Sequence, residues 1–206
     1  MERLQVSATK SSLLRLKDEL GFAREGKDLL SQKREVLVME MMRLQEDVHK
    51  AREELDDLLA RAYDAFAGAA MLEGFRQMER LAPALPSGPA VIVHERSVMG
   101  VALPMVESPA VAYRPTYGLA QGSSETDRTV RLFLEVREKL LEVAETETAI
   151  YRLAVEARKT IRRERALENL FIPQYEATLK YIEESLEEKE REGFYQLKLA
   201  KKRRNP

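Results

Sequence analysis

A long heptad stripe is the sequence feature that most constrains the fold. Apolar residues recur at alternating steps of three and four from Leu13 to Leu72, and only Lys27 and Arg34 interrupt the series. A repeat of 3.5 residues keeps one stripe of a helix against a partner only when the two helices wind around each other left-handedly. Because the pattern persists for about eight heptads, it predicts one long coiled-coil helix in the N-terminal part of the chain.

A second apolar series runs through the C-terminal half. It follows the heptad step from Phe133 to Ile161, with Val136, Leu140 and Ala157 among its members and Glu147 as the polar exception. Beyond this point the phase slips, and apolar residues recur mostly at steps of four, which favours a straighter helix.

Local signals mark the start and the middle of this second helix. Ser124 or Thr126 can cap its N-terminus, with Asp127 in the first turn. Pro173 lies inside the helical pattern and has no N–H to donate to the carbonyl of Asn169. We therefore expect a kink or a loosened turn at that point.

The segment between the two helices has a different character. Most of the eight prolines lie between residues 83 and 115, where they exclude a long helix. Residues 90–96 are rich in β-branched side chains, and a second such run surrounds Gly100. These runs predict a small β-hairpin, in which Pro104 confines the second strand to an edge.

Two apolar stripes joined by an insert can cover each other if the chain folds back antiparallel. The predicted fold is all-α, a long antiparallel two-helix coiled coil with a small central insert that contains a short β-hairpin. We divide the chain into an N-terminal coiled-coil helix (1–80), a central head with the hairpin (81–125), and a C-terminal coiled-coil helix with a basic tip (126–206).

A simple register sets Leu72 opposite Phe133. In this register Lys27 lies near Glu176 and Arg34 lies near Glu168, and we predict that each of these two pairs forms an ion pair.

The charge balance limits the classes of partner. The chain carries 34 Lys and Arg against 35 Asp and Glu, and 33% of its residues are charged. Because positive and negative charges nearly cancel, the chain lacks the excess of basic residues that is typical of nucleic-acid-binding proteins. A basic cluster ends the chain, where it also suits the negative end of a helix dipole. We expect it to enter a protein socket with an acidic or polar lining.

The sequence offers few residues that could form a catalytic, metal or nucleotide-binding site. Cysteine is absent, which excludes disulfides and thiolate sites. Glu46 and His49 have the Glu-x-x-His spacing of carboxylate-bridged metal sites, but those sites need a second such motif, and His94 lies in the insert. There is no phosphate loop or dinucleotide fingerprint. We expect a non-enzyme without catalytic, cofactor or metal residues.

No apolar stretch approaches the roughly 20 residues needed to cross a bilayer. We therefore expect a cytoplasmic protein that is peripheral to any membrane, reaching it through partners and without direct insertion.

Several segments have the sequence motifs of one protein family. They lie at Val6–Lys10, Leu13–Lys17, Ala23–Leu30, Lys33–Glu35, Ser97–Pro104, Glu145–Thr148, Arg162–Glu168, Ile172–Gln174, Lys180–Ile182 and Glu190–Lys198. In order and spacing these segments resemble the D subunit of V-type and A-type rotary ATPases, and the resemblance spans nearly the whole chain.

The resemblance implies a central rotor shaft. Both termini would insert into the hexamer of catalytic and non-catalytic subunits, and the middle would dock on the membrane-side socket subunit of the rotor. The small F subunit of the stalk would bind the side of the coiled coil. Such a shaft transmits torque between ATP turnover and proton or sodium translocation, in ATP synthesis or ATP-driven pumping, without binding nucleotide itself.

Candidate partner-contact residues come from the same segments and from the tip. They are Met99, Gly100, Arg162, Arg163, Lys198, Lys201, Lys202, Arg203 and Arg204. The alternative function is a self-associating structural coiled-coil scaffold. A nucleic-acid-binding helical hairpin is a third hypothesis, but the balanced charge argues against it, and we expect no nucleic-acid partner.

Overall fold

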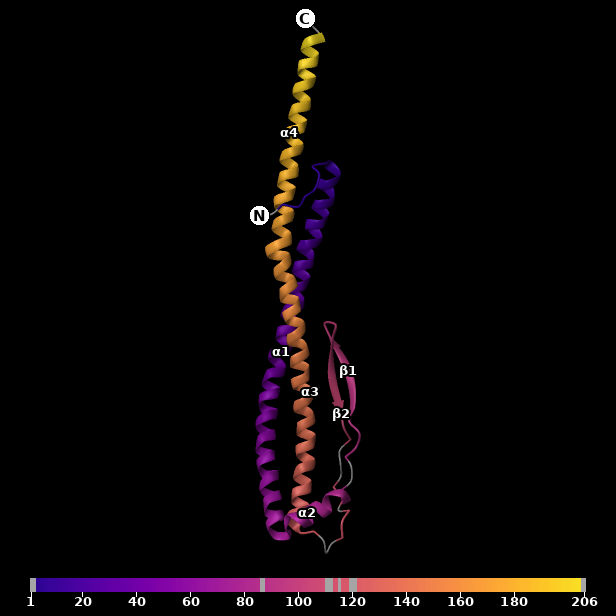
Figure 1. The fold of residues 1–206 in the computed structure, drawn as a ribbon, viewed down its shortest axis with the longest axis vertical. Coiled ribbons are helices and arrows are strands. Elements are labelled where there is room, and N and C mark those ends of the chain that lie inside the picture. Colours follow the sequence, from indigo (N-terminus) through magenta and orange to yellow (C-terminus); the bar gives the residue numbers. More distant parts are fainter. Residues whose placement is uncertain (1–2, 86–87, 110–112, 115, 119–121, 205–206) are drawn as a thin grey trace. The chain divides into compact units, whose positions relative to one another are not determined.

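The computed structural model describes residues 3–85, 88–109, 113–114, 116–118 and 122–204, with side-chain exposure as far as residue 201. The helices are α1 (Lys10–Glu73), α2 (Phe75–Leu81), α3 (Ser124–Ala166) and α4 (Ile172–Arg204), and the strands are β1 (Ile92–Val98) and β2 (Val101–Glu107) (Figure 1). A short 3-10 helix, η1, covers Ala82–Ala84, and a π-helical turn, η2, covers Leu167–Phe171. The predicted fold class is confirmed.

The chain forms two compact units. The first unit consists of Met1–Glu35 and Ala157–Pro206, and the second consists of Val36–Glu156. Both α1 and α3 contribute to each unit, because their boundaries span the division. Each unit contains its own antiparallel pair of helices.

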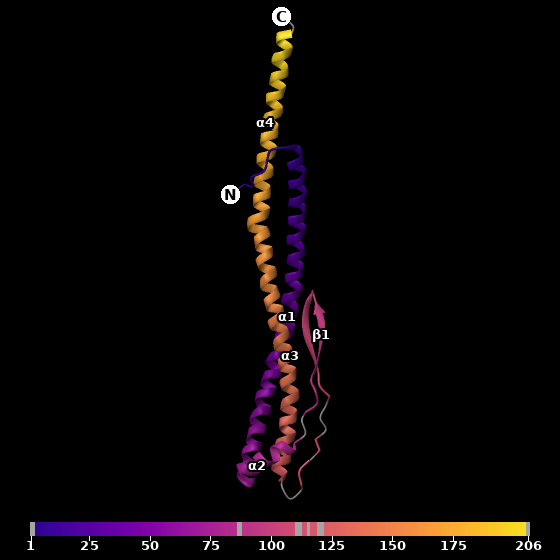
Figure 2. The same cartoon turned by 45° about the vertical axis from the view of Figure 1, so that its right-hand side comes forward.

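An apolar seam joins the two helices of the first unit. Leu16 of α1 packs with Leu179 and Ile182 of α4, and all three are buried. Partly buried residues extend this cluster along both helices: Leu13, Leu20, Tyr175 and Leu186. Figure 2 shows the start of α1 lying along α4. The seam therefore uses the heptad positions that the sequence predicts for α1.

The segment before α1 also returns to α4. The backbone N–H of Leu4 donates to the Thr178 hydroxyl at 3.1 Å, and the Arg3 guanidinium lies 4.8 Å from the centre of the Tyr181 ring. Thr9 then caps α1, because its hydroxyl accepts from the N–H of Ser12 at 3.2 Å. The N-terminal residues are thus held against α4 before the helix begins.

Ion pairs along the first unit show a register about one helical turn from the predicted one. Glu176 pairs with Arg24 at 2.7 Å and not with Lys27. Arg34 pairs with Glu164 at 2.9 Å and not with Glu168. The prediction was anchored on Leu72, which is 70% exposed and therefore not a seam residue.

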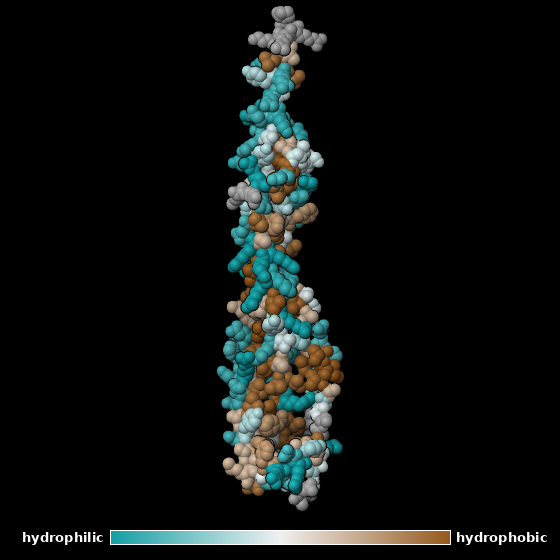
Figure 3. Space-filling model, in the orientation of Figure 1, coloured by the Kyte–Doolittle hydropathy of each residue, from teal (hydrophilic) through white to brown (hydrophobic). Residues whose placement is uncertain are grey.

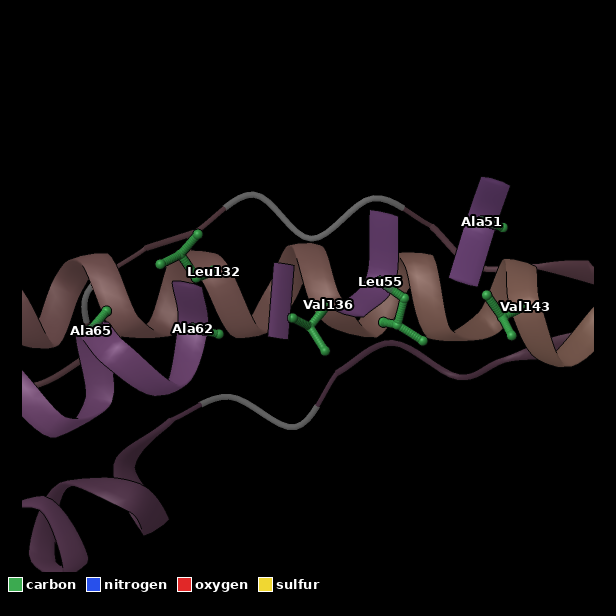
Figure 4. Close-up of a cluster of buried hydrophobic side chains, with 7 residues drawn as sticks. All are labelled: Ala51, Leu55, Ala62, Ala65, Leu132, Val136 and Val143. Carbon is green, nitrogen blue, oxygen red and sulfur yellow. The ribbon is translucent and has the colours of Figure 1, made fainter. Parts of the chain in front are cut away.

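The second unit has a seam rich in alanine. Figure 4 shows its buried side chains, Ala51, Leu55, Ala62 and Ala65 of α1 with Leu132, Val136 and Val143 of α3. Every buried residue of α1 lies on the predicted stripe. The α3 stripe is partly wrong, because Leu132 is buried where Phe133 was expected and Leu140 is half exposed.

Pro173 has the predicted effect on the helix. The N–H of Ile172 donates to the carbonyl of Leu167, five residues back, so η2 is wider than an α-helical turn. Pro173 has no N–H to donate to the carbonyl of Asn169, and a helix commonly widens or kinks next to such a proline.

The described residues contain no helix with the length and apolar character needed to cross a membrane.

We predict that Leu16→Ala lowers the free energy of unfolding by about 3 kcal/mol, because truncating a buried leucine removes apolar contacts and leaves a cavity. Leu16 is 1% exposed. The matched control is Leu14→Ala, two residues away and 65% exposed, which we expect to change stability by about 0.5 kcal/mol or less. Urea denaturation followed by circular dichroism measures both. Equal losses in the two variants would contradict the assigned seam.

Candidate partner-binding surfaces

The tip of the β-hairpin presents an apolar side chain on a strained backbone. Met99 and Gly100 form the two-residue loop, with φ angles of 49° and 79°. With positive φ at both positions the loop is of type I′, a conformation that glycine adopts freely and methionine does not. Met99 is the one non-glycine residue with positive φ in the described part of the chain, and its side chain is 48% exposed.

An ion pair ties β1 to α1. The Arg96 guanidinium lies 3.1 Å from Glu40 Oε1, which also pairs with Arg43 at 2.7 Å. The hydrogen bond from Arg43, together with the charges of both arginines, outweighs the effect of burial and lowers the pKa of Glu40. Glu40 is therefore a charged anchor for the hairpin.

Two side chains of α3 hold β2. The backbone N–H of Val106 donates to Glu145 Oε2 at 2.8 Å, and Arg152 Nη1 donates to the carbonyl of Ala102 at 2.8 Å. Arg152 also reaches Glu95 Oε1 at 3.4 Å. These contacts use the edge of β2 that faces away from β1.

Arg137 of α3 fastens the base of the hairpin. Its Nη2 donates to the carbonyl of Pro89 at 2.9 Å and to the Ser108 hydroxyl at 3.0 Å. A Cβ added at Gly88 would lie 3.1 Å from Arg137 Nε, so the close approach favours glycine there. The two ends of the hairpin therefore meet at one arginine.

An apolar cavity of about 600 Å³ lies where α1, α2 and the start of α3 meet. Aromatic and aliphatic side chains form most of its wall, among them Tyr63, Phe66, Phe75, Leu81, Phe133 and Leu134. The rings of Tyr63 and Phe133 pack edge to face with centres 5.6 Å apart, as do those of Phe66 and Phe75 at 6.3 Å.

A polar network borders this cavity at the start of α3. Glu73 Oε1 accepts hydrogen bonds of 2.5 Å from the Ser123 N–H and from the Thr126 hydroxyl. Burial disfavours the Glu73 carboxylate, but these hydrogen bonds outweigh that effect and lower its pKa. The predicted caps, Ser124 and Thr126, were wrong, since Ser123 is the N-cap and accepts from the Thr126 N–H at 3.3 Å.

Asp127 binds two tyrosines at the same place. Its Oδ1 accepts from Tyr113 Oη at 2.6 Å and from Tyr117 Oη. Both hydrogen bonds stabilise the charged carboxylate and lower the pKa of Asp127. Burial and the neighbouring carboxylate raise the pKa of Tyr117, so its hydroxyl stays protonated.

The end of α4 is an exposed extension of the first unit. Lys10 and Glu190 pair at 2.9 Å, and α4 continues to Arg204 beyond that described contact (Figures 1 and 2). We call residues 191–204 the C-terminal extension. Four large apolar side chains lie exposed on it, Phe194, Tyr195, Leu197 and Leu199. Charge patterning alone finds the basic residues of this segment and misses these four.

The remaining candidate contact residues lie apart from one another. Arg162 and Arg163 are exposed on α3, and Arg162 Nε reaches the Arg158 carbonyl of its own helix at 3.4 Å. Lys198 and Lys201 are exposed on the C-terminal extension, about 50 Å further along the helical path at 1.5 Å per residue.

The candidates Lys202, Arg203 and Arg204 continue the helix, but their side chains lie outside the described residues.

The histidines do not assemble a metal site. His49 is exposed, and His94 Nε2 lies 3.4 Å from Glu107 across the hairpin. Within the described ranges, no group of three or more His, Cys, Asp or Glu side chains could hold a metal ion.

Comparison with known proteins decides the family. The family model for the D subunit of ATP synthase matches residues 12–202. The chain belongs to the ATP synthase D-subunit family. The match contains the heptad stripe, the hairpin and most of the C-terminal extension.

Individual relatives agree along almost the full length. The chain is 36% identical over 200 residues to the V-type ATP synthase D subunit of Thermotoga neapolitana, which covers 97% of this chain and 98% of the relative. It is 37% identical over 198 residues to the A-type ATP synthase D subunit of Methanopyrus kandleri, covering 95% and 85%. The A-type ATP synthase D subunit of Pyrococcus furiosus is 34% identical over 203 residues, covering 97% and 95%.

In this family member, the cavity network should make stability depend on pH. Because hydrogen bonds lower the folded-state pKa of Asp127, its stabilisation is present above the unfolded-state pKa and is lost as pH falls through the folded-state pKa. Asp127→Asn should lower stability at pH 7 by about 1.5–3 kcal/mol, the range for a hydrogen bond to a charged group. It should also reduce the further loss of stability below about pH 5, where carboxylates begin to be protonated.

Thermal unfolding at neutral pH and at two acidic pH values measures this effect. Asp57→Asn, at an exposed position of α1, is the control and should keep the pH dependence of the unmodified chain. Identical pH profiles for the two variants would count against the Asp127 network.

Proposed function

We propose that the chain is the central rotor shaft of a rotary ATPase. It transmits torque between ATP turnover in a catalytic hexamer and the translocation of protons or sodium ions by a membrane ring. In this role it supports ATP synthesis or ATP-driven ion pumping and is itself non-catalytic. Membership of the D-subunit family supports the proposal, and the observation that most strongly carries it is the exposed C-terminal extension of α4.

The extension has the composition of a helix that a protein sleeve surrounds. Aromatic and aliphatic side chains stay in water on a helix that also carries exposed Lys198 and Lys201. Burying such side chains in a partner removes apolar area from water, and the basic groups suit polar or acidic surroundings. We therefore place this end, together with the N-terminal segment beside α4, inside the hexamer of catalytic and non-catalytic subunits.

A pair of helices is a suitable element for carrying torque. Interior backbone groups of each helix are hydrogen-bonded within that helix. When torque twists the pair, the contacts between the helices, at the apolar seam and beside it, therefore bear the stress. In the first unit, inter-helix ion pairs flank the seam at Lys10–Glu190, Lys17–Glu183 and Arg24–Glu176. In the second unit, Arg52 pairs with Glu147 at 2.6 Å, and Lys139 pairs with Glu54.

The asymmetric surface of the shaft couples its rotation to the states of the catalytic interfaces. One chain presents different side chains around its circumference, so three equivalent catalytic interfaces meet three different surfaces. A surface that contacts the open and closed states of an interface unequally shifts the balance between them by that difference. Rotation then changes which interface is open, and the shaft needs no nucleotide site of its own.

The remaining partners follow from the same proposal. The membrane-side socket subunit of the rotor would bind the middle of the chain, in the second unit, and the small F subunit of the stalk would bind the side of the helix pair. The protein would be peripheral to the membrane on its cytoplasmic side, through the assembled complex. No cofactor and no nucleic acid take part.

A truncation tests the role of the extension. Removing residues 190–206 should leave the helix pair folded, because the buried seam residues of the first unit, Leu16, Leu179 and Ile182, all lie outside the deleted segment. We expect weaker binding to the hexamer or ATP hydrolysis that is uncoupled from transport. Co-purification and coupled transport assays measure both.

Point variants sharpen the test. Phe194→Ala combined with Leu197→Ala should reproduce part of the loss, while Glu192→Ala on the same segment should not. Full assembly and coupling after truncation would exclude this terminus as the axle, and a stable homodimer without hexamer binding would favour the scaffold alternative.

Deleting the hairpin tests the role of the insert. Removal of residues 88–108 is sterically simple, because both ends contact Arg137. We expect unchanged helicity, since the seam residues lie outside the deletion, together with disturbed docking or ATPase activation. Circular dichroism and ATPase assays of the assembled complex measure these outcomes. A loss of helicity would show that the hairpin belongs to the core.

A further inference from the structure

The β-hairpin has one protected edge and one open edge. The outer edge of β2 is covered by α3, where Glu145 accepts from the Val106 N–H and Arg152 donates to the Ala102 carbonyl. Pro104 lies between these two residues and has no N–H that needs a partner. In the described part of the chain the sheet has two strands, so β1 forms its other edge.

The register identifies the backbone groups on the open edge. In an antiparallel pair, residues alternate between those that bond to the partner strand and those that point away from it. Ala102 and Val106 point away from β1, so their opposite residues, Ser97 and Val93, point away from β2. Glu95, opposite Pro104, does the same. The N–H and C=O groups of these β1 residues thus form an outward row.

Exposed apolar side chains lie beside this row. Val91, Ile92 and Val93 of the β1 segment are 42%, 50% and 58% exposed, and Met105 of β2 is 39% exposed. Figure 3 shows hydrophobic side chains gathered over the hairpin. A strand edge with an apolar flank offers backbone hydrogen bonds and side-chain burial to the same incoming segment.

The hairpin is held in place without using this edge. An isolated two-stranded hairpin is marginally stable in water. Here Arg137 fastens its base, Glu145 and Arg152 hold β2, and Glu40 binds the Arg96 side chain. The open row of β1 is therefore pre-organised, which lowers the entropic cost of binding.

Charges on β1 argue against a second copy of this chain as the occupant. Antiparallel pairing of two β1 strands through their outward rows overlaps the whole strand when Glu95 lies opposite Glu95, and the next register sets Arg96 opposite Arg96. Like charges directly opposite each other destabilise a sheet. Glu95 contacts Arg152 through Oε1 at 3.4 Å, yet its side chain stays 62% exposed, so it can also pair with a basic residue of a different strand. Such a strand, with an apolar residue opposite Val93, meets complementary groups.

We infer that the outward edge of β1 is a strand-addition site for an extended segment of a protein partner within the rotary complex. The segment carries apolar residues at alternate positions and a basic residue that faces Glu95. This inference rests on the proposed function, because the partner is a subunit of that complex.

Backbone hydrogen exchange tests the site directly. The chain is measured alone and after assembly with the catalytic hexamer, the small stalk subunit and the membrane-side rotor subunits. We expect the amides of Val93, Glu95 and Ser97 to exchange rapidly in the free chain and at least about tenfold more slowly in the complex, the effect of one added hydrogen bond per amide.

Two variants at one position separate the backbone from the side chain. Val93→Pro removes an outward N–H without touching a β1–β2 hydrogen bond, and Pro104 shows that an outward position of this hairpin accepts proline. Val93→Thr keeps the N–H and the branched shape. We expect protection of Glu95 and Ser97 in the complex to fall by about tenfold in the proline variant and by about twofold or less in the threonine variant.

The outcomes are distinguishable. Assembly with unprotected β1 amides would overturn the strand-addition site and leave the proposed function standing. Protection that appears in the free chain as its concentration rises would identify a second copy and also overturn the inference. A chain that fails to assemble would overturn both. If Val93→Pro disrupts the inner β1–β2 amides of the free chain, the unmodified chain and the threonine variant decide alone.

Discussion

Everything else in this protein depends on the burial of one apolar stripe between antiparallel helices. Helices of this length cannot cover their own apolar faces, so α1 needs α4 in the first unit and α3 in the second. The stripe concentrates burial on few residues, which leaves the rest of each helix free for charge. This is why a chain with 33% charged residues still has a core.

The two seams achieve this burial differently. In the first unit, long side chains such as Leu16 and Ile182 fill the space between helices, and ion pairs flank them. In the second unit, the small side chains of Ala51, Ala62 and Ala65 share the seam with leucine and valine. The hairpin then attaches to the outside of the second pair through arginines and glutamates. Polar groups therefore position the insert, while apolar groups build the helix pairs.

Sequence predicts the seam of α1 better than that of α3. In α1 nearly every heptad position is apolar and most of the neighbouring positions are polar, so only one choice of heptad phase fits the sequence. In α3, Leu132 stands beside Phe133 and Leu153 beside Ala154, so two phases fit almost equally well there. At both of these places the buried residue, Leu132 or Leu153, is the neighbour that the heptad count rejected.

The register and the hairpin anchors lie beyond what local sequence can predict. The register depends on η2, because a wide turn changes the angular phase of all residues that follow it. The anchors depend on contacts between distant residues, such as Arg137 with Pro89 or Glu73 with Ser123. Nothing near Arg137 in the sequence distinguishes it from the many solvent-exposed arginines of the chain.

The wide turn at η2 also fixes the direction in which the C-terminal extension points its side chains. An α-helix advances about 100° per residue, so adding or deleting one residue between Leu167 and Phe171 would rotate Phe194 and Leu197 around the helix axis by nearly a third of a turn. The same change would rotate Leu179 and Ile182 out of the seam with α1, because that part of α4 lies between the turn and the extension. Homologues should therefore tolerate substitutions within the turn far better than changes in its length.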